Sequence, residues 1–359
     1  MKFLLGIDVG SSSVKCALIE IDSGACVASA YAPSSEMQIH APQSGFAEQH
    51  PDTWWNELRN AMSMLADEYD YKKNDIAAIG ISYQMHGLVM VDKDGHPLRP
   101  SIIWCDSRAV EIGNHAFQQL GETFCLEHYL NSPGNLTASK LKWVKENQPE
   151  IYSHIHKIML PGDYIAYKMT GEMRTTISGL SEGVLWDALH ENTAADLLNY
   201  YGIDERLLCK TVDQFGEQGL LTEKAASELG LSPSIPICYR AGDQPNNAFS
   251  LNVLNPGEVA ATAGTSGVVY GVIDQPSYDP ASRVNTFVHV NHTPEKKRYG
   301  VLLCVNGTGI LNSWLQKNVF SNKTYPEINA LASEIPIGAD GILCYPFGNG
   351  AERVLENKN

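Results

Sequence analysis

The first third of the chain alternates short apolar runs with clusters of turn-forming residues. The apolar runs cover residues 2–9, 14–21, 25–31, 76–82 and 87–91, and an Asp-Ser-Gly turn at residues 22–24 joins the second run to the third. Runs of this length predict strands, and the short turns predict that the first three strands form consecutive hairpins.

Between the third and fourth of these runs, the hydrophobic spacing becomes helical. His50, Pro51 and Asp52 form a helix-start signal. The apolar residues that recur at helical spacing after it are Trp54, Trp55, Leu58, Ala61, Met62, Leu65, Ala66 and Tyr69. Three strands, a helix and further strands, in this order, indicate an α/β protein with a mixed sheet.

The rest of the chain is first helical and then strand-rich. Residues 109–200 are mainly helical in pattern, most clearly at 136–147 and 161–169, and a short helix is predicted at 221–229. In the part that follows, strands are expected at residues 237–241, 258–263, 267–272, 286–290 and 298–305, and helices at 309–319 and 325–333. We predict a domain boundary near residues 234–242, which separates domains 1–240 and 241–359.

The composition narrows the function classes. Lys and Arg total 26 against 41 Asp and Glu, so the formal net charge is −15. This charge opposes binding to a phosphate backbone and argues against a nucleic-acid partner. No apolar run approaches the about 20 residues needed to cross a bilayer, so no membrane partner is expected. The eight cysteines are scattered without a Cys-x-x-Cys pair, as expected for reduced thiols in a cytoplasmic protein.

A turn after the first predicted strand carries residues suited to binding phosphate. It contains Gly10, Ser11 and Ser12, and Asp8 precedes it at the strand end. Backbone N–H groups and serine hydroxyls at a hairpin tip can hold phosphate oxygens. Asp8 could bind Mg²⁺ directly or through water, because hard cations prefer oxygen ligands. A plain hairpin turn is the alternative for this segment.

A second turn, Gly-Thr-Ser-Gly at residues 264–267, lies between two predicted strands in the same way. The similarity indicates either a weak internal duplication or two unrelated hairpins. Neither turn is a P-loop, because the chain has no Gly-x-x-x-x-Gly-Lys-Ser/Thr segment. The Gly-x-Gly pairs at residues 307–309 and 348–350 lack the third glycine of a dinucleotide fingerprint. These absences argue against P-loop ATPases and nicotinamide dehydrogenases.

Three further segments place polar side chains near predicted strand ends. Met85 and His86 follow the strand at residues 76–82. Ligands of α/β sheets bind in crevices just beyond such strand ends, so the two residues could contact a ligand. The alternative is that His86 is a structural histidine held by hydrogen bonds. Residues 104–108 combine an aromatic ring, a carboxylate and a guanidinium, which suits a ligand rich in hydroxyls or else a salt bridge beside a core tryptophan. Asp243 follows a predicted strand and could act as a general base, as a helix N-cap, or as both.

In their order along the chain, these segments resemble those of the FGGY carbohydrate kinases of the actin-like ATPase superfamily. Residues 8–15 and 264–266 are similar to the family's two phosphate motifs, and residues 84–87 to the sugar-contact segment of xylulose kinases in particular. Further similar stretches are residues 104–108, 136–144, 160–164 and 169–172. The resemblance implies an α/β fold of the actin-like, ribonuclease H-like kind, with two related domains around a cleft.

The resemblance also implies a reaction and its residues. The γ-phosphoryl group of ATP would pass in line to a primary hydroxyl of a ketopentose, most closely D-xylulose. Asp243 would be the base, and Asp8 and Asp243 would be the catalytic pair and the ligands of Mg²⁺. ATP would be bound by Gly10, Ser11, Ser12, Lys15, Gly264, Thr265 and Ser266. The sugar would be bound by Met85, His86, Trp104, Asp106, Asp243 and Gln244. The sugar and ATP are then the expected partners, and the resemblance suggests a homodimer.

Two features depart from the family pattern. Gln244 follows Asp243, where many xylulose kinases carry Asn. The pair Asp-Gln occurs in the glycerol kinase branch of the family. That branch lacks the Met-His-Gly segment that this chain has at residues 85–87. The family's adenine-binding segment comes after a point that corresponds to residues 345–359. We therefore expect the second domain to be incomplete in this chain, with its apolar face partly uncovered. Alternatives are a kinase for another ketose or a polyol such as glycerol, or a truncated, non-catalytic sugar-binding protein.

Overall fold

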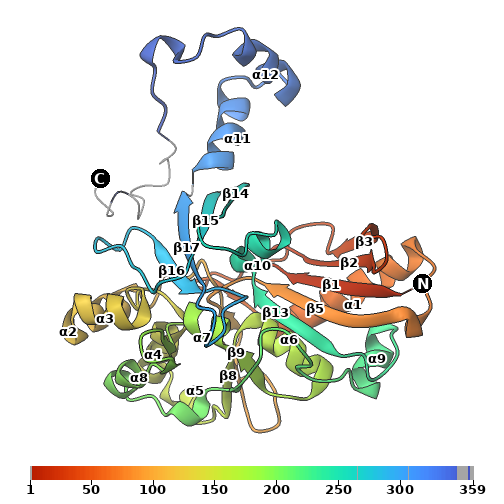
Figure 1. Cartoon of the computed structure of the whole chain (residues 1–359), viewed down its shortest axis with the longest axis vertical. Helices are drawn as coiled ribbons and strands as arrows, with labels where there is room; N and C mark the ends of the chain where they lie inside the picture. Colours follow the sequence, from red (N-terminus) through yellow and green to blue (C-terminus); the bar gives the residue numbers. More distant parts are fainter. Residues whose placement is uncertain (1, 265, 306, 346–354, 356–359) are drawn as a thin grey trace.

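The N-terminal strands form a mixed sheet in the computed structural model, which describes residues 2–264, 266–305, 307–345 and 355. The order of strands is β13-β5-β1-β2-β3 (Figure 1). The strands are β1 (Phe3–Val9), β2 (Val14–Glu20), β3 (Cys26–Ala32), β5 (Ile76–Tyr83) and β13 (Ile237–Gly242). β1, β2 and β3 pair antiparallel, whereas β5 is parallel to both β1 and β13. The predicted mixed sheet is confirmed.

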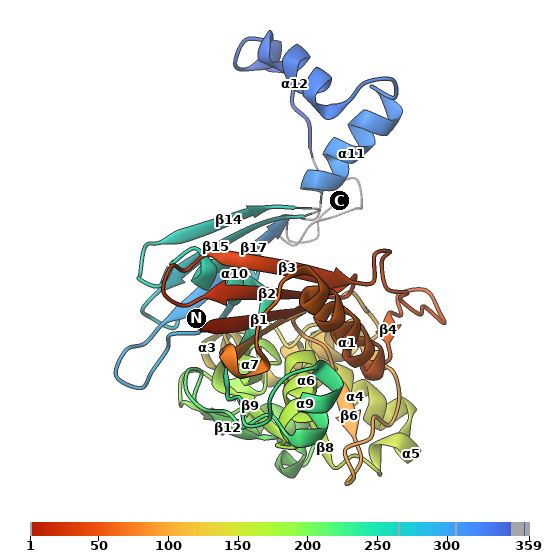
Figure 2. The same ribbon diagram turned by 90° about the vertical axis from the view of Figure 1, so that its right-hand side faces the viewer.

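Helix α1 (Pro51–Glu68) covers one face of this sheet (Figure 2). His50 caps the helix, because its Nδ1 accepts a hydrogen bond from the Asp52 N–H at 3.3 Å. The apolar side of α1 packs in one core with every second side chain of β1. The alternate side chains of β1, including Asp8, lie on the opposite face of the sheet, because successive side chains of a strand point to opposite faces.

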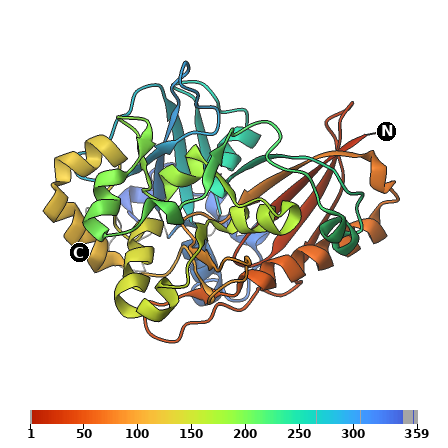
Figure 3. The same ribbon diagram turned by 90° about the horizontal axis from the view of Figure 1, so that it is seen from below.

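The segment between β5 and β13, which the structure describes throughout, contains eight α-helices (Figure 3). It has a hydrophobic core of its own. Its helices are α2 (Val110–Leu120), α3 (Glu122–Tyr129), α4 (Thr137–Asn147), α5 (Pro149–Tyr152), α6 (Pro161–Thr170), α7 (Ile177–Glu182), α8 (Ala195–Tyr201) and α9 (Glu223–Leu229). The short strands are β4 (Glu48–Gln49), β6 (Val89–Val91), β7 (Ser101–Ile102), β8 (Lys157–Met159), β9 (Arg174–Thr176), β10 (Trp186–Asp187), β11 (Asn192–Thr193) and β12 (Lys210–Val212). No helix among the described residues has the length and apolar character to span a bilayer.

The second sheet is antiparallel, with the order β14-β15-β17-β16. Its elements and those that follow it are β14 (Val259–Ala263), β15 (Gly267–Ile273), β16 (Asn285–Val288), β17 (Tyr299–Val305), α11 (Thr308–Asn318) and α12 (Tyr325–Ser333). α11 and α12 extend away from the rest of the molecule (Figures 1 and 2). Val259, Val269 and Trp314 are 59%, 43% and 53% exposed. Apolar surface is thus uncovered in this part, as the sequence predicts.

The structure corrects one assignment in the strand order. The strand at residues 237–241 was expected to open the second strand-rich part, but β13 pairs with β5 in the first sheet. Local spacing identifies a strand and does not identify its partner, because a parallel partner lies across a long connection. The boundary near residues 234–242 stays a prediction. The remaining predicted strands and helices are present with ends shifted by up to two residues, and a further helix, α10 (Asp243–Ser250), directly follows β13.

A buried ion pair joins β13 to the helical part. Arg240 is 1% exposed, and its Nη1 donates to Asp163 Oδ1 at 3.2 Å and to the carbonyl of Arg174 at 3.0 Å. Its Nε donates to Gln218 Oε1 at 2.8 Å. The guanidinium therefore connects the last strand of the first sheet to α6 and β9, and the carboxylate of Asp163 depends on it for charge compensation.

We expect Arg240→Met to lower the free energy of unfolding by about 3–5 kcal/mol, because it leaves the buried Asp163 carboxylate without its cation. Urea unfolding followed by circular dichroism measures the change. Arg206→Met is the matched control, since Arg206 pairs with Asp204 in solvent, with side chains 89% and 46% exposed. The control should unfold like the unsubstituted chain, and equal unfolding of both variants would contradict the role given to Arg240.

Candidate active site

Parallel strand pairing brings three of the segments with predicted site residues to one edge of the first sheet. In the pairing register, Tyr83 at the end of β5 lies opposite Val9 of β1 and Gly242 of β13. The turn after Val9, the Met85–His86 segment and Asp243 therefore all emerge at the carboxyl ends of parallel strands. Ligands of open α/β sheets bind at this edge.

The turn between β1 and β2 is tight and held by its surroundings. The Gly10 N–H donates to the Ser13 carbonyl at 3.1 Å, and a Cβ atom at Gly10 would come within 3.0 Å of that oxygen. The Ser11 hydroxyl accepts a hydrogen bond from Trp104 Nε1 at 3.2 Å, and its carbonyl accepts one from Gln49 Nε2 at 2.7 Å. The structure thus brings two predicted site residues, Ser11 and Trp104, into contact.

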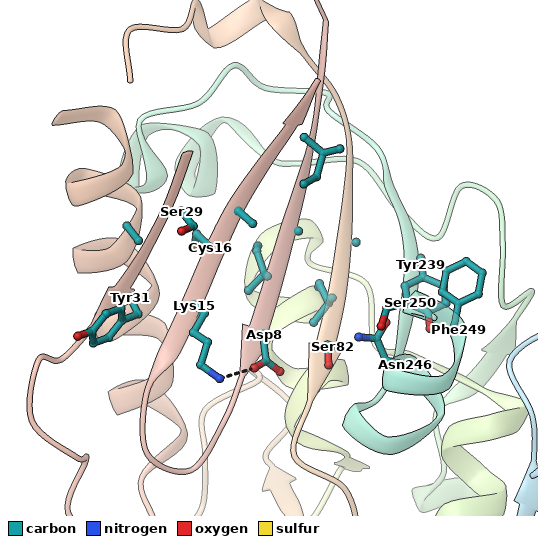
Figure 4. Close-up of a pocket in the computed structure, with 17 residues that line it drawn as sticks. Asp8, Lys15, Cys16, Ser29, Tyr31, Ser82, Tyr239, Asn246, Phe249 and Ser250 are labelled. Atoms are coloured by element: carbon teal, nitrogen blue, oxygen red, sulfur yellow. Dashed lines mark hydrogen bonds and ion pairs between the residues drawn. The ribbon is translucent and has the colours of Figure 1, made fainter. Parts of the chain in front are cut away.

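Asp8 lies on the face of the sheet that α1 leaves open. Its Oδ2 forms an ion pair with Lys15 Nζ at 3.1 Å (Figure 4). Both side chains line a cavity of about 600 Å³ beneath α10, with Ser82 and Asn246 also at its polar end. Glycines and alanines of the sheet, with Tyr239 and Phe249, form its apolar remainder. The carboxylate of Asp8 is 34% exposed, so it is accessible to a cation.

Asp243 is the first residue of α10, and this helix contacts both sheets. α10 packs against β13 and β5 on one side and against β14 and β15 on the other (Figure 1). Burial and, to a lesser extent, the negative charge of Asp8 raise the pKa of Asp243 to about 6, opposed by hydrogen bonds from Gln244. The helix N-cap is Gly242, so the alternative reading of Asp243 as the N-cap is wrong.

Met85 and His86 form a strained corner next to Asp243. His86 has a positive φ of 60°, and its N–H donates to Glu182 Oε1 at 3.1 Å. A Cβ atom at Gly242 would lie 2.5 Å from both Met85 Cγ and Glu182 Oε2. Only a glycine therefore fits between this corner and Asp243.

Glu182 is a site residue that the sequence did not reveal. It ends α7, is 1% exposed, and its pKa is raised well above the ordinary value, mainly by burial. Burial disfavours the charged form of this carboxyl group, and the nearby carboxylates of Asp243 and Asp163 disfavour it as well. Gln84, also buried, has side-chain oxygen and nitrogen atoms without a hydrogen-bond partner among the described residues. A buried amide without partners retains the capacity to bind a polar ligand.

Asp106 is fully buried, and protein donors occupy its carboxylate. Its oxygens accept hydrogen bonds from the Ala47 N–H at 2.6 Å and from Arg108 Nη2 at 2.6 Å, Nε at 2.9 Å and N–H at 2.9 Å. Arg108 also pairs with Glu48 at 2.6 Å. This arrangement matches the salt bridge considered from the sequence, except that Trp104 is 51% exposed and is not a core residue. A contact of Asp106 with sugar stays a prediction.

Lys140 connects the two segments proposed to contact sugar. It lies in α4, is 0% exposed, and its Nζ donates to the carbonyls of His86 and Ile103, each at 2.9 Å. Burial lowers the pKa of Lys140 to about 7, partly offset by the negative charge of Asp106. Neither charge pattern nor spacing distinguishes this lysine from Lys142 and Lys145, the half-buried lysines of α4, so sequence reasoning missed it.

The second turn is described only in part. The Gly264 N–H donates to the Ser266 carbonyl at 3.0 Å, as the Gly10 N–H does to Ser13. Both turns connect antiparallel strands, β1 to β2 and β14 to β15. The two bonds span different distances along the chain, three residues in the first turn and two in the second, and the internal duplication stays a prediction. Thr265 lies outside the described residues, and binding of phosphate by either turn stays a prediction.

Comparison with known proteins identifies the family. Residues 3–250 match the sequence model of the FGGY family of carbohydrate kinases, N-terminal domain. The chain is 28% identical over 367 residues to a xylulose kinase of Staphylococcus xylosus, covering 99% of this chain and 72% of that protein. With a xyloylose kinase from Brucella ovis, the structural match has 28% identity and a TM-score of 0.79, and covers 88% of this chain and 63% of the other.

Two more distant structures share the fold. Ligand-bound xylulose kinase from Lactobacillus acidophilus has a TM-score of 0.86 at 24% identity and covers 97% of this chain and 69% of its own. Plasmodium falciparum glycerol kinase with ADP has a TM-score of 0.81 at 20% identity, over 96% and 70% of the two chains.

The described chain thus spans 63–72% of the length of these relatives and has their actin-like α/β fold. Because the family sequence match covers more than half of its residues, the chain belongs to the FGGY family of carbohydrate kinases.

Proposed function

We propose that this protein transfers the γ-phosphoryl group of ATP to a primary hydroxyl of a ketopentose, with D-xylulose as the best candidate. The observation that carries the proposal is the placement of Asp8, Asp243 and the Met85–His86 corner at one sheet edge. Relatives named xylulose kinases, at 28% identity, support the ketopentose. We assign sugar binding to residues 1–240 and ATP binding to residues 241–359.

Asp243 acts in this proposal as the base that accepts the proton of the sugar hydroxyl. A base works best when its pKa lies near the operating pH, and the pKa of Asp243 is raised to about 6. Met85, His86, Trp104, Asp106 and Gln244 hold the sugar so that its hydroxyl faces Asp243. Positioning of the two reactants provides most of the rate enhancement in phosphoryl transfer.

The carboxylates of Asp8 and Asp243 also fit Mg²⁺. Both carboxylates offer oxygen atoms as ligands, and Asp8 is partly exposed. The negative charges of the two side chains repel each other, and a cation between them would relieve this repulsion. When bound, Mg²⁺ would neutralise charge on the phosphate oxygens of ATP. Lys15 lies beside Asp8 and would bind the same phosphates, together with Gly10, Ser11, Ser12, Gly264, Thr265 and Ser266.

Two alternatives come from particular observations. The pair Asp243–Gln244 resembles the glycerol kinase branch, and a glycerol kinase shares the fold at 20% identity, which supports a polyol or another ketose. A sugar-binding protein without turnover is the other alternative. From the resemblance and the eight free cysteines, we also propose a cytoplasmic location and a homodimer.

Asp243→Asn should reduce sugar-dependent ADP formation ~10²–10⁴-fold, the range for loss of a general base. Sugar affinity measured by calorimetry should change far less, because the amide keeps the shape of the carboxylate and one of its acceptor oxygens. Asp22→Asn, in the exposed β2–β3 turn, is the matched control and should behave like the unsubstituted chain.

Acceptors to compare are D-xylulose, glycerol and gluconate, with MgATP. Turnover that survives in Asp243→Asn would overturn the assignment of the base. Binding of D-xylulose without any ADP formation by the unsubstituted chain would favour the non-catalytic alternative, and preference for glycerol would favour the polyol.

The rate should depend on the protonation of Asp243. Because the base acts only when ionised, kcat/KM should rise with pH and level off above about pH 6, the raised pKa of Asp243. Asp8→Asn removes a negative charge that raises this pKa, so the acid limb should move to lower pH. Glu182 also faces Asp243, and its own pKa is raised by burial. An acid limb at the same pH in both proteins would contradict this coupling.

Lys140 is proposed as a positioning residue, since it holds the His86 and Ile103 carbonyls together. Lys140→Met should raise the KM for sugar about tenfold, as expected for about 1.4 kcal/mol lost from positioning, while the KM for ATP stays within twofold. Lys142→Met, on the same helix and bonded to Tyr201 and Glu146, is the control. Equal increases in both KM values, or no change, would show a general structural role instead.

A further inference from the structure

A cluster of two histidines and an aspartate lies outside the proposed active site. His128 is in the last turn of α3, Asp187 is in β10, and His190 is in the turn between β10 and β11. Among the described residues, it is one of two groups of His, Asp, Glu or Cys side chains whose ligand atoms all lie within 4.8 Å of one another. The proposed phosphoryl transfer uses none of its three members.

Both imidazole rings point the same nitrogen at one carboxylate oxygen. His128 Nδ1 lies 2.8 Å and His190 Nδ1 lies 3.0 Å from Asp187 Oδ2. A tetrahedral ion at about 2.0–2.1 Å from nitrogen ligands separates them by about 3.4 Å. Each Nδ1 atom thus needs to move about 0.4–0.6 Å further from Asp187 Oδ2 to admit such an ion, and all three donor atoms already lie within 4.8 Å of one another.

Further contacts from the surrounding residues hold two members of the cluster in place. The other carboxylate oxygen, Asp187 Oδ1, accepts hydrogen bonds from the N–H groups of Leu189 at 2.9 Å and His190 at 3.0 Å. The ring of His128 stacks on Phe124 with centroids 4.1 Å apart. These contacts hold the Asp187 carboxylate and the His128 ring in position, so binding would not have to order flexible side chains.

The donor set and access select the kind of ion. Two imidazoles and one carboxylate suit Zn²⁺ and similar transition metals, whereas Mg²⁺ prefers oxygen ligands alone. His128 and Asp187 are 12% and 5% exposed at the side chain, but His190 is 59% exposed and provides the entry side. A neutral imidazole can carry its proton on Nε2 when Nδ1 binds metal, so binding needs a change of tautomer and no other reactant.

The next residue links the cluster to the second sheet. Glu191 pairs with His292 at 3.3 Å and with Lys297, both from the β16–β17 connection. Beside it, Ala188 packs with Leu130, Val288 and Tyr299 in a small apolar cluster. An ion that fixes the β10–β11 turn would therefore also stabilise the contact between the helical part and the second sheet.

We propose that His128, Asp187 and His190 form a structural binding site for a divalent transition metal of the Zn²⁺ class, which joins α3 to the β10–β11 turn. The second group of this kind, Asp92, Asp94 and His96, provides an internal comparison. It is mostly exposed, and its single imidazole makes it a poorer match for Zn²⁺.

The test is calorimetric titration of the full chain with ZnCl₂ in excess MgCl₂, with thermal unfolding measured in parallel. The unsubstituted chain should bind one Zn²⁺ at this site and unfold at a higher temperature when Zn²⁺ is present. His190→Gln should weaken this binding at least ~10-fold and abolish the thermal shift. Since His190 is exposed, the variant should fold normally.

His96→Gln is the matched control and should bind Zn²⁺ like the unsubstituted chain. Cobalt(II) provides a second readout, because four-coordinate Co²⁺ absorbs visible light strongly, and this band should be lost in both His190→Gln and His128→Gln. Equal Zn²⁺ binding by His190→Gln and the unsubstituted chain, or loss of binding only in His96→Gln, would overturn the proposal. Neither outcome depends on whether the protein phosphorylates a sugar.

Discussion

The parallel pairing of β1, β5 and β13 determines where the chemistry of this protein can occur. Antiparallel neighbours end at opposite edges of a sheet, whereas parallel strands deliver whatever follows them to the same edge. Here the residues after Val9, Tyr83 and Gly242 meet, although more than 200 positions of sequence separate the first from the last. The long helical segment between β5 and β13 is what makes the second parallel pairing sterically feasible.

Charged side chains buried around this edge are matched in pairs and networks. Arg240 compensates Asp163, and Arg108 compensates Asp106 and Glu48. Removing a charge from water is expensive, so such pairs add little net stability but become strongly unfavourable when one partner is missing. Lys140 differs, because backbone carbonyls and no carboxylate accept its hydrogen bonds. Its pKa is lowered because these partners do not fully compensate the cost of burying its charge. Lys140 is therefore better suited to holding the two carbonyls in place than to stabilising the fold.

Sequence spacing predicted the elements that carry these residues and not the contacts between them. β1, β2, α1 and β5 follow from periods of two and 3.6, which are local properties. The sheet membership of β13 and the role of Lys140 depend on partners far away in sequence, so no local pattern contains them. Similarly, the carboxylate of Asp106 is satisfied by the N–H of Ala47, 59 residues earlier. In the sequence, nothing distinguishes Glu182 from an ordinary polar residue. Only the fold, through α7, places its side chain against Gly242.

The position of α10 places Asp243 where the two sheets meet. Its first residue, Asp243, is at the edge of the first sheet, while the body of the helix packs on β14 and β15 of the second. The repulsion between the carboxylates of Asp243 and Asp8 depends on their separation. Because this repulsion contributes to the raised pKa of Asp243, a cation beside Asp8 would lower that pKa. In the proposed reaction, the strength of Asp243 as a base would therefore depend on whether Mg²⁺ is bound.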